Sequence, residues 1–296
     1  MKRFVTLFAA TFAFLCVGGI SGAAARPADA KPGLWKLSDA DTTIYLFGTI
    51  HVLPKNYVWR TPIVERAIAA SNELMLEVAD TGDTDMVRAV FTELATSPGL
   101  PPVNERVPPK KLARLTAMMT TLGRKMEQMT PFESWAVSLV LVGAMLRDVG
   151  LEPQSGVEEQ LTSLFTTAKK PISSLETTRE QLGFFDTLSE TAQRFLLASM
   201  IDGSATQRKQ FDAMISAWRR GDMKAISATF DRELKSSPEL LGALLTRRNI
   251  NWTDRITKRL ETPGIVFVAV GAGHLAEEQS VQTMLGKRGL KVIRVQ

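Results

Sequence analysis

The chain has 296 residues, of which 45% are hydrophobic and 23% are charged. This composition is typical of a globular protein that is long enough to bury a full core. The formal net charge of +5 is too small to favour nucleic acid as a partner. The single cysteine, Cys16, lies in an N-terminal apolar stretch, so the rest of the chain has neither a disulfide nor a thiolate metal site.

The first 25 residues have the pattern of a secretory signal peptide. Lys2 and Arg3 form the charged start, an apolar run covers Phe4–Ile20, and small residues up to Ala25 suit cleavage. An uncleaved membrane anchor is the alternative, but the short apolar run and the small residues favour cleavage. We therefore expect a periplasmic or secreted protein, with a single domain over residues 26–296 and no stable membrane anchor after cleavage.

The residues after this leader predict a β-hairpin, a helix and a buried strand. Leu34–Leu37 and Ile44–Phe47 are expected to pair across a turn. Thr61 and a following proline are a typical helix start, and this helix should end near Ser71. The mainly apolar run Glu73–Ala79 predicts a buried strand with one carboxylate, Glu77, in its interior.

A long helical tract follows, and prolines divide it into separate helices. The expected helices are Thr84–Thr96, Pro109–Gln128, Phe132–Asp148, Val157–Ala168, Thr177–Leu188, Ser189–Ile201, Ala205–Arg219, Met223–Leu234 and Glu239–Leu260, the last with a possible break. One strand, Pro171–Leu175, interrupts the tract, and the chain closes with strand Ile265–Val270, helix Ala276–Gly286 and strand Lys291–Val295. We expect an α/β (α+β) fold, with a small central sheet built from the N- and C-terminal segments and a large helical insertion at about residues 84–260.

The two histidines of the chain occupy matching positions. His51 ends the sequence Gly48-Thr-Ile-His, and His274 ends Gly271-Ala-Gly-His, each just after a strand-like run. Loops at the carboxyl ends of strands are where α/β proteins place functional residues. Two neutral imidazoles on facing loops can bind a divalent metal. The alternative is a pair of helix-capping or core histidines.

Several charged residues are further candidates. Glu77 needs a partner, because a carboxylate is costly to bury in an apolar strand. It could be a metal ligand or a general base near the histidines, or it could point outward into a salt bridge. Glu176 and the pair Arg248 and Asn249 could bind substrate, but from the residues alone surface charges at helix ends are the favoured interpretation. Glu158 is most simply explained by the helix dipole.

In combination these segments resemble the TraB/GumN family, which is also similar to the animal Tiki proteins. The resemblance runs from about Leu34 to the C-terminus and rests on Leu46–His51, Leu76–Glu77, Gly156–Glu158, Lys170–Thr177 with Gln181, Arg248–Asn249 and Val270–Leu275. It implies a metal-dependent hydrolase scaffold with a site formed by His51, His274 and Glu77. It also implies a preference for manganese or cobalt, because the Tiki relatives are regarded as peptidases that prefer these metals.

Residues and resemblance together predict an exported metal-dependent hydrolase, a peptidase that acts on a peptide or protein substrate. His51, His274 and Glu77 would hold a manganese or cobalt ion, or alternatively zinc. Glu77, Arg248 and Asn249 would be the catalytic residues, as base and as groups that orient the substrate or stabilise negative charge. The competing expectations are a non-catalytic periplasmic protein that binds a metal, haem or another ligand, and a structural protein of envelope or polysaccharide assembly.

Overall fold

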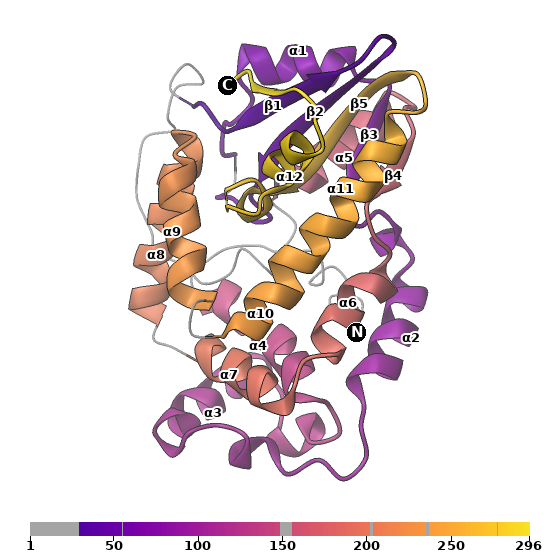
Figure 1. Ribbon diagram of the computed structural model, residues 1–296. Helices are drawn as coiled ribbons and strands as arrows, with labels where there is room; N and C mark the ends of the chain where they lie inside the picture. The colour runs from indigo at the N-terminus through magenta and orange to yellow at the C-terminus, as the bar shows by residue number, and fades with distance from the viewer. Residues whose placement is uncertain (1–29, 55, 149–155, 202–203, 235–236, 277) are drawn as a thin grey trace.

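A computed structural model describes most of the chain after the predicted signal peptide, which lies outside the described residues. The described ranges are 30–54, 56–148, 156–201, 204–234, 237–276 and 278–296 (Figure 1). Within them the chain forms a mixed sheet with helices around it and a helical part at one end (Figure 1). The predicted α/β (α+β) fold is confirmed.

The sheet has six strands in the order β4-β3-β5-β2-β1-β6. Their bounds are β1 Leu34–Ser38, β2 Thr42–Thr49, β3 Glu73–Leu76, β4 Ile172–Ser174, β5 Gly264–Gly271 and β6 Val292–Arg294. Strands β1 and β2 form the predicted antiparallel hairpin, and β6 pairs with β1. Strand β5 lies parallel to β2 on one side and to β3 on the other, and β3 lies parallel to β4. The carboxyl ends of β2, β3, β4 and β5 therefore meet at one edge of the sheet.

Most of the predicted helices form. Their bounds are α1 Pro62–Ala70, α2 Thr84–Ala95, α3 Leu112–Thr121, α4 Ser134–Asp148, α5 Val157–Thr167, α6 Thr178–Asp186, α7 Glu190–Met200, α8 Ser204–Arg219, α9 Met223–Leu234, α10 Pro238–Leu241, α11 Arg247–Arg259 and α12 Val281–Lys287. Helices α3, α4 and α7 gather at the end away from the sheet, and α11 runs back from this helical part along the sheet (Figure 1).

Most predicted bounds differ from the observed ones by one or two residues, and three elements begin or end at least three residues away. The helix predicted to reach Gln128 ends at Thr121, because Gly123 adopts a left-handed φ of 65° that stops a helix. The helix predicted from Ala276 begins only at Val281, and a short 3₁₀ turn precedes it. The strand predicted to reach Ala79 ends at Leu76, so Glu77 lies just beyond the sheet rather than inside a strand.

The break expected within residues 239–260 is a π-helical turn. Helix α10 passes through this turn, Gly242–Thr246, directly into α11. π turns are rare and occur often at functional sites. Here the turn comes immediately before Arg248 and Asn249, two of the predicted site residues.

Helix α4 forms part of the core of the helical half. Its apolar run Trp135–Leu146 is buried almost throughout, as predicted. None of the helices in the described ranges combines the length and the apolar character that crossing a membrane requires.

Candidate functional site

The two Gly-x-x-His loops lie side by side at the carboxyl edge of the sheet. In the parallel pairing of β2 with β5, Gly48 is opposite Val270 and Thr49 is opposite Gly271. Both loops therefore leave the sheet at the same level. The two histidines that follow are buried, with 8% of His51 and 3% of His274 exposed.

Three of the predicted site residues converge on the bare α-carbon of Gly271. A Cβ atom at this position would lie 3.3 Å from Oε1 of Glu77, 3.3 Å from Nε2 of His51 and 3.7 Å from Cδ2 of His274. Nε2 of His274 lies 3.9 Å from Oε1 of Glu77. Because any other residue at Gly271 would crowd these atoms, glycine leaves the space between them open.

The hydrogen bonds of His274 define its tautomer. Asn249 donates its amide nitrogen to the carbonyl of Gln279 at 2.9 Å, which turns its Oδ1 toward His274. Nδ1 of His274 lies 2.6 Å from this oxygen and must carry the proton, so Nε2 is unprotonated and accepts from Nη1 of Arg248 at 3.2 Å. Burial and the positive charge of Arg248 lower the pKa of His274 to about 3, which makes this ring neutral at ordinary pH.

His51 has the opposite charge state. Its Nδ1 lies 2.7 Å from Oε1 of Glu158, which also accepts a hydrogen bond from the Thr49 hydroxyl. The contact is an ion pair rather than an aligned hydrogen bond, because Nδ1 has no well-directed hydrogen-bond partner among the described residues. Burial alone would lower the pKa of His51, but the negative charges of Glu158 and Glu77 outweigh it and raise the pKa to about 9.

Arg248 links the histidines to two buried glutamates. Its Nη2 donates to Oε2 of Glu77 at 2.6 Å and to Oε1 of Glu176 at 2.5 Å, and its Nε also donates to Glu176. Glu77 also accepts the backbone N–H of Gly271 at 2.7 Å. Burial would raise the pKa of Glu77, but the positive charge of Arg248, together with the histidines and this N–H, lowers it to about 2. Glu77 is therefore ionised.

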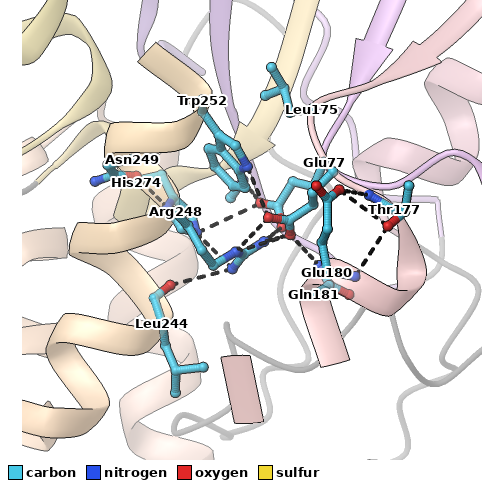
Figure 2. Close-up of polar contacts among 12 residues, drawn as sticks. Glu77, Leu175, Thr177, Glu180, Gln181, Leu244, Arg248, Asn249, Trp252 and His274 are labelled. Atoms are coloured by element: carbon cyan, nitrogen blue, oxygen red, sulfur yellow. Dashed lines mark hydrogen bonds and ion pairs between the residues drawn. The ribbon is translucent and has the colours of Figure 1, made fainter. Parts of the chain in front are cut away.

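Trp252 closes the cluster on the side of α11. Its indole donates to Oε2 of Glu176 at 3.0 Å, and the Arg248 guanidinium lies 4.6 Å from the ring centroid. The ring of His274 lies 4.2 Å from the Trp252 ring. Figure 2 shows Arg248 between His274 on one side and the carboxylate of Glu77 on the other.

The surface interpretation of Glu176, Arg248 and Asn249 is wrong. These residues are 3%, 3% and 0% exposed, respectively. Arg247, which precedes Arg248 in the chain, is exposed. Trp252 and Ile256 follow Arg248 at intervals of four residues and are also buried. This spacing puts Arg248 on the apolar face of α11. The same spacing is visible in the sequence and could have predicted that Arg248 is buried.

Glu176 had a comparable signal. It follows β4 as Glu77 follows β3, and these strands are parallel neighbours in which Leu76 pairs with Ser174. The N–H of Glu176 donates to the carbonyl of Glu77 at 2.9 Å. A carboxylate after each of two parallel strands indicates that the two groups lie close together at one sheet edge.

Glu158 is more than a charge at a helix start, because it is the partner of His51. Helix α5 begins against the His51 loop, where the N–H of Val157 donates to the carbonyl of Ile50 at 3.1 Å. A Cβ atom at Gly156 would lie only 2.1 Å from the carbonyl oxygen of His51. Glycine thus permits the approach that brings Glu158 to the imidazole, and the inclusion of Gly156–Glu158 in the family resemblance was the available signal.

A small pocket adjoins the two histidines. Apart from Thr49, the histidines and the loop glycines, its walls are apolar, formed by Ile50, Met214, Phe230, Leu245 and Ala272. It has room for about one water molecule. The pocket therefore gives one small molecule access to the imidazoles beside an apolar surface.

The donors at this site fit a divalent metal in kind. Imidazole nitrogen and carboxylate oxygen are ligands that zinc, manganese and cobalt accept, and the bare α-carbon of Gly271 leaves space among them. Among the described residues, no three His, Cys, Asp or Glu side chains are arranged closely enough to hold an ion. Metal binding would therefore require the side chains to draw together, His51 to lose its proton and Arg248 to release Nε2 of His274.

Comparison with known proteins identifies the family of the chain. No curated protein sequence and no solved structure matches it. The model of the TraB/PrgY/gumN family matches residues 33–294, a range that includes both histidine loops and the Arg248 cluster. The resemblance inferred from the sequence is confirmed, and the chain belongs to the TraB/PrgY/gumN family.

Proposed function

We propose that this protein is an exported, metal-dependent hydrolase that cleaves peptide bonds. One observation carries the proposal: each histidine has its Nδ1 beside an oxygen acceptor, while Nε2 of His51 and a carboxylate oxygen of Glu77 face the same space at Gly271. Metal-binding histidines are typically oriented in this way, through a second partner at the other ring nitrogen. Export rests on the signal-peptide pattern of the first 25 residues.

His51, His274 and Glu77 would hold the ion. Manganese or cobalt is the expected metal by family resemblance, and zinc suits the same donors. When bound, the ion lowers the pKa of a water molecule and polarises the substrate carbonyl.

The surrounding residues have separate tasks in this proposal. Glu158 and Asn249 hold the two rings in orientation through their Nδ1 atoms. Glu77 is ionised and so is able to accept a proton from the attacking water. Arg248 keeps Glu77 in place and provides a fixed positive charge next to His274, where negative charge on a substrate oxygen would be stabilised.

Metal analysis and a peptide-substrate screen test the proposal together. The mature protein and the double variant His51→Ala/His274→Ala are loaded with manganese, cobalt or zinc, dialysed and analysed for metal. We expect close to one ion per chain and metal-dependent peptide cleavage in the unmodified protein, and neither in the double variant. Full activity in either single histidine variant would contradict the assignment.

Glu77→Gln has a matched control at the start of the strand that Glu77 follows. Glu73 begins β3 and pairs with Arg259 of α11 at 2.9 Å, as Glu77 pairs with Arg248. We expect Glu77→Gln to lower activity and Glu73→Gln to leave it unchanged. An equal loss in both variants would indicate a general effect on folding rather than a role of Glu77 in the reaction.

Binding without turnover is the second candidate function. The observation in its favour is that Arg248 holds the pKa of Glu77 at about 2, which makes this carboxylate a weak base for a water molecule. Stoichiometric metal that depends on the histidines, with no cleavage of any peptide in the screen, would favour this candidate.

A further inference from the structure

A second pocket borders the buried cluster on a different wall. It lies between α6 and α11, and Leu175 and Glu176 contribute to its lining. Its cavity volume of about 310 Å³ is far larger than the space for about one water molecule beside the histidines, and it reaches the lower end of the range of pockets that bind small molecules. The proposed hydrolase reaction makes no use of it.

Gly183 helps to keep this pocket open. It lies within α6 and lines the pocket, and a Cβ atom at this position would meet no other atom within 4 Å. Glycine lowers the stability of a helix interior relative to alanine, and here no close neighbour requires it. Because Gly183 has no side chain, the space beside this part of α6 stays open to the pocket.

The charge that lacks a partner in the pocket is positive. Glu176 is bound by Arg248, and Glu180 is bound at 2.5 Å by Arg255, which also donates to the carbonyl of Leu175. The exposed guanidinium of Arg247 makes no ion pair or side-chain hydrogen bond within the described part of the chain, and its charge acts only at longer range on Glu239, which lies outside the pocket lining. A ligand that complements this pocket is therefore an anion.

A ligand in this pocket would be in contact with the histidine cluster through two side chains. Glu176 forms part of the pocket wall and accepts hydrogen bonds from Arg248 and from the Trp252 indole. Arg248 in turn contacts Glu77 and His274 (Figure 2). A shift of the Glu176 carboxylate would thus change the surroundings of the Trp252 indole and, through Arg248, those of Glu77 and His274.

We propose that this pocket is an effector site for a small oxyanion, a carboxylate or a phosphate, held by Arg247. The amide of Asn251 also lines the pocket and supplies further hydrogen-bond donors. Binding is transmitted to the histidine site through Glu176 and Arg248.

The Trp252 indole N–H reports on this binding directly. The chain has five tryptophans, so the indole signals in a ¹⁵N-labelled full-length protein are few, and Trp252→Phe assigns the one of interest. Benzoate and inorganic phosphate are titrated separately at constant ionic strength, and calorimetry follows binding in parallel. We expect a saturable shift of the Trp252 signal with at least one of the two probes.

Three variants decide the interpretation. Arg247→Gln removes a charge-assisted contact and should weaken binding about 10-fold or more, and Gly183→Leu should fill the pocket and abolish the shift. Arg66→Gln is the matched control, because Arg66 is an exposed arginine of α1 with no ion pair in the described ranges. It should bind as the unmodified protein does.

The outcomes separate the ligand sources and can overturn the proposal. A shift with benzoate alone assigns a carboxylate with an apolar body, a shift with phosphate alone assigns a phosphate, and shifts with both assign oxyanions in general. No saturable binding of either probe, or equal binding by Arg247→Gln, would overturn the site. Binding that leaves the Trp252 signal in place would overturn the coupling. None of these measurements depends on hydrolase activity, so they remain decisive if the proposed function fails.

Discussion

The two Gly-x-x-His loops have the same sequence pattern but opposite electrostatic environments. His51 lies against Glu158, and its pKa is raised to about 9. His274 lies against Asn249 and Arg248, and its pKa is lowered to about 3. One ring is therefore a cation and the other is neutral, although both are buried at the same edge of the sheet.

This difference shows that the motif sets position and the neighbours set chemistry. Each loop brings an imidazole to the end of a strand, but the partner at Nδ1 comes from a distant segment, α5 for His51 and α11 for His274. Neighbouring groups with pKa values pushed apart are typical of sites that hold an acid and a base together. Changing one neighbour at a time should therefore reduce or abolish the difference between the two histidines.

Arg248→Met should have the largest effect. It removes the cation that Glu77 and Glu176 share and leaves two buried carboxylates without their partner. Breaking a buried ion pair from one side costs about 3–5 kcal/mol, so the midpoint of urea denaturation should fall steeply. The pKa of His274 should also rise, because the positive charge of Arg248 contributes to lowering it.

Arg259→Met is the control for this variant. It breaks the ion pair with Glu73 at the opposite end of β3 and α11, where both side chains are 16% exposed. The loss should be smaller than for Arg248→Met, because only one carboxylate loses its partner and water reaches it more easily. If the two variants lost equal stability, the buried cluster would not be the stronger electrostatic unit.

Gly156→Ala should disturb only the first loop. The added methyl group would lie 2.1 Å from the carbonyl oxygen of His51, so α5 and the loop must separate. Overpacking of this kind costs about 1–3 kcal/mol. Thermal denaturation should show the loss, and the NMR signal of His51 should move while that of His274 stays in place.

Gly286→Ala provides a comparison at an open position. This glycine lies within α12, and a Cβ atom there would meet nothing within 4 Å. Replacing it should stabilise the helix by about 0.5–1 kcal/mol. A similar gain from Gly156→Ala would contradict the close contact of α5 with the His51 loop.

The fold was largely predictable because its signals are local. Strand and helix periods, the Thr61 cap and the prolines located most elements. The errors arose where the chain departs from the hydrophobic pattern. Gly123 ends α3 early, and β3 ends at Leu76, one residue before Glu77. The π turn at Gly242–Thr246 has no distinct sequence pattern, so it was foreseen only as a possible break.

The site was predictable only in part, because its electrostatics depend on contacts between distant segments. The sequence located both histidines by their positions after strand-like runs, and Glu77 as the one carboxylate inside a mainly apolar run. It did not predict that Glu158 pairs with His51, since 107 positions separate them in the chain and the contact depends on the packing of α5. Nor did it predict from the residues alone that Arg248 is buried between two glutamates.

Glu158→Gln should make His51 resemble His274. Without the carboxylate the pKa of His51 should fall by about 1–3 units from about 9. Because the folded pKa lies above the ordinary 6.5, the ion pair stabilises the fold below about pH 6.5, and this contribution is lost as the pH rises through about 9. The unmodified protein should therefore be more stable than the variant at pH 6.5, and the difference should shrink by pH 9.

The measurement is a pH titration of ¹⁵N-histidine-labelled, chelator-treated protein. With two histidines in the chain, the spectrum has one set of signals for each ring. An unchanged His51 titration in Glu158→Gln would show that the ion pair does not set its charge. A parallel change of His274 would show that the two loops are not independent.

Asn249→Asp is the reciprocal change and should have the smallest effect on the histidine pKa values, although it also removes the hydrogen bond to the carbonyl of Gln279. It gives His274 a carboxylate at Nδ1, in the same relation that Glu158 has to His51. The pKa of His274 should rise from about 3, by about 1 unit, because an adjacent negative charge favours the protonated ring. It should stay below that of His51, because burial and Arg248 continue to oppose protonation. A His274 pKa equal to that of His51 would show that the Nδ1 partner alone sets the charge of each ring, and that Arg248 contributes nothing to the difference.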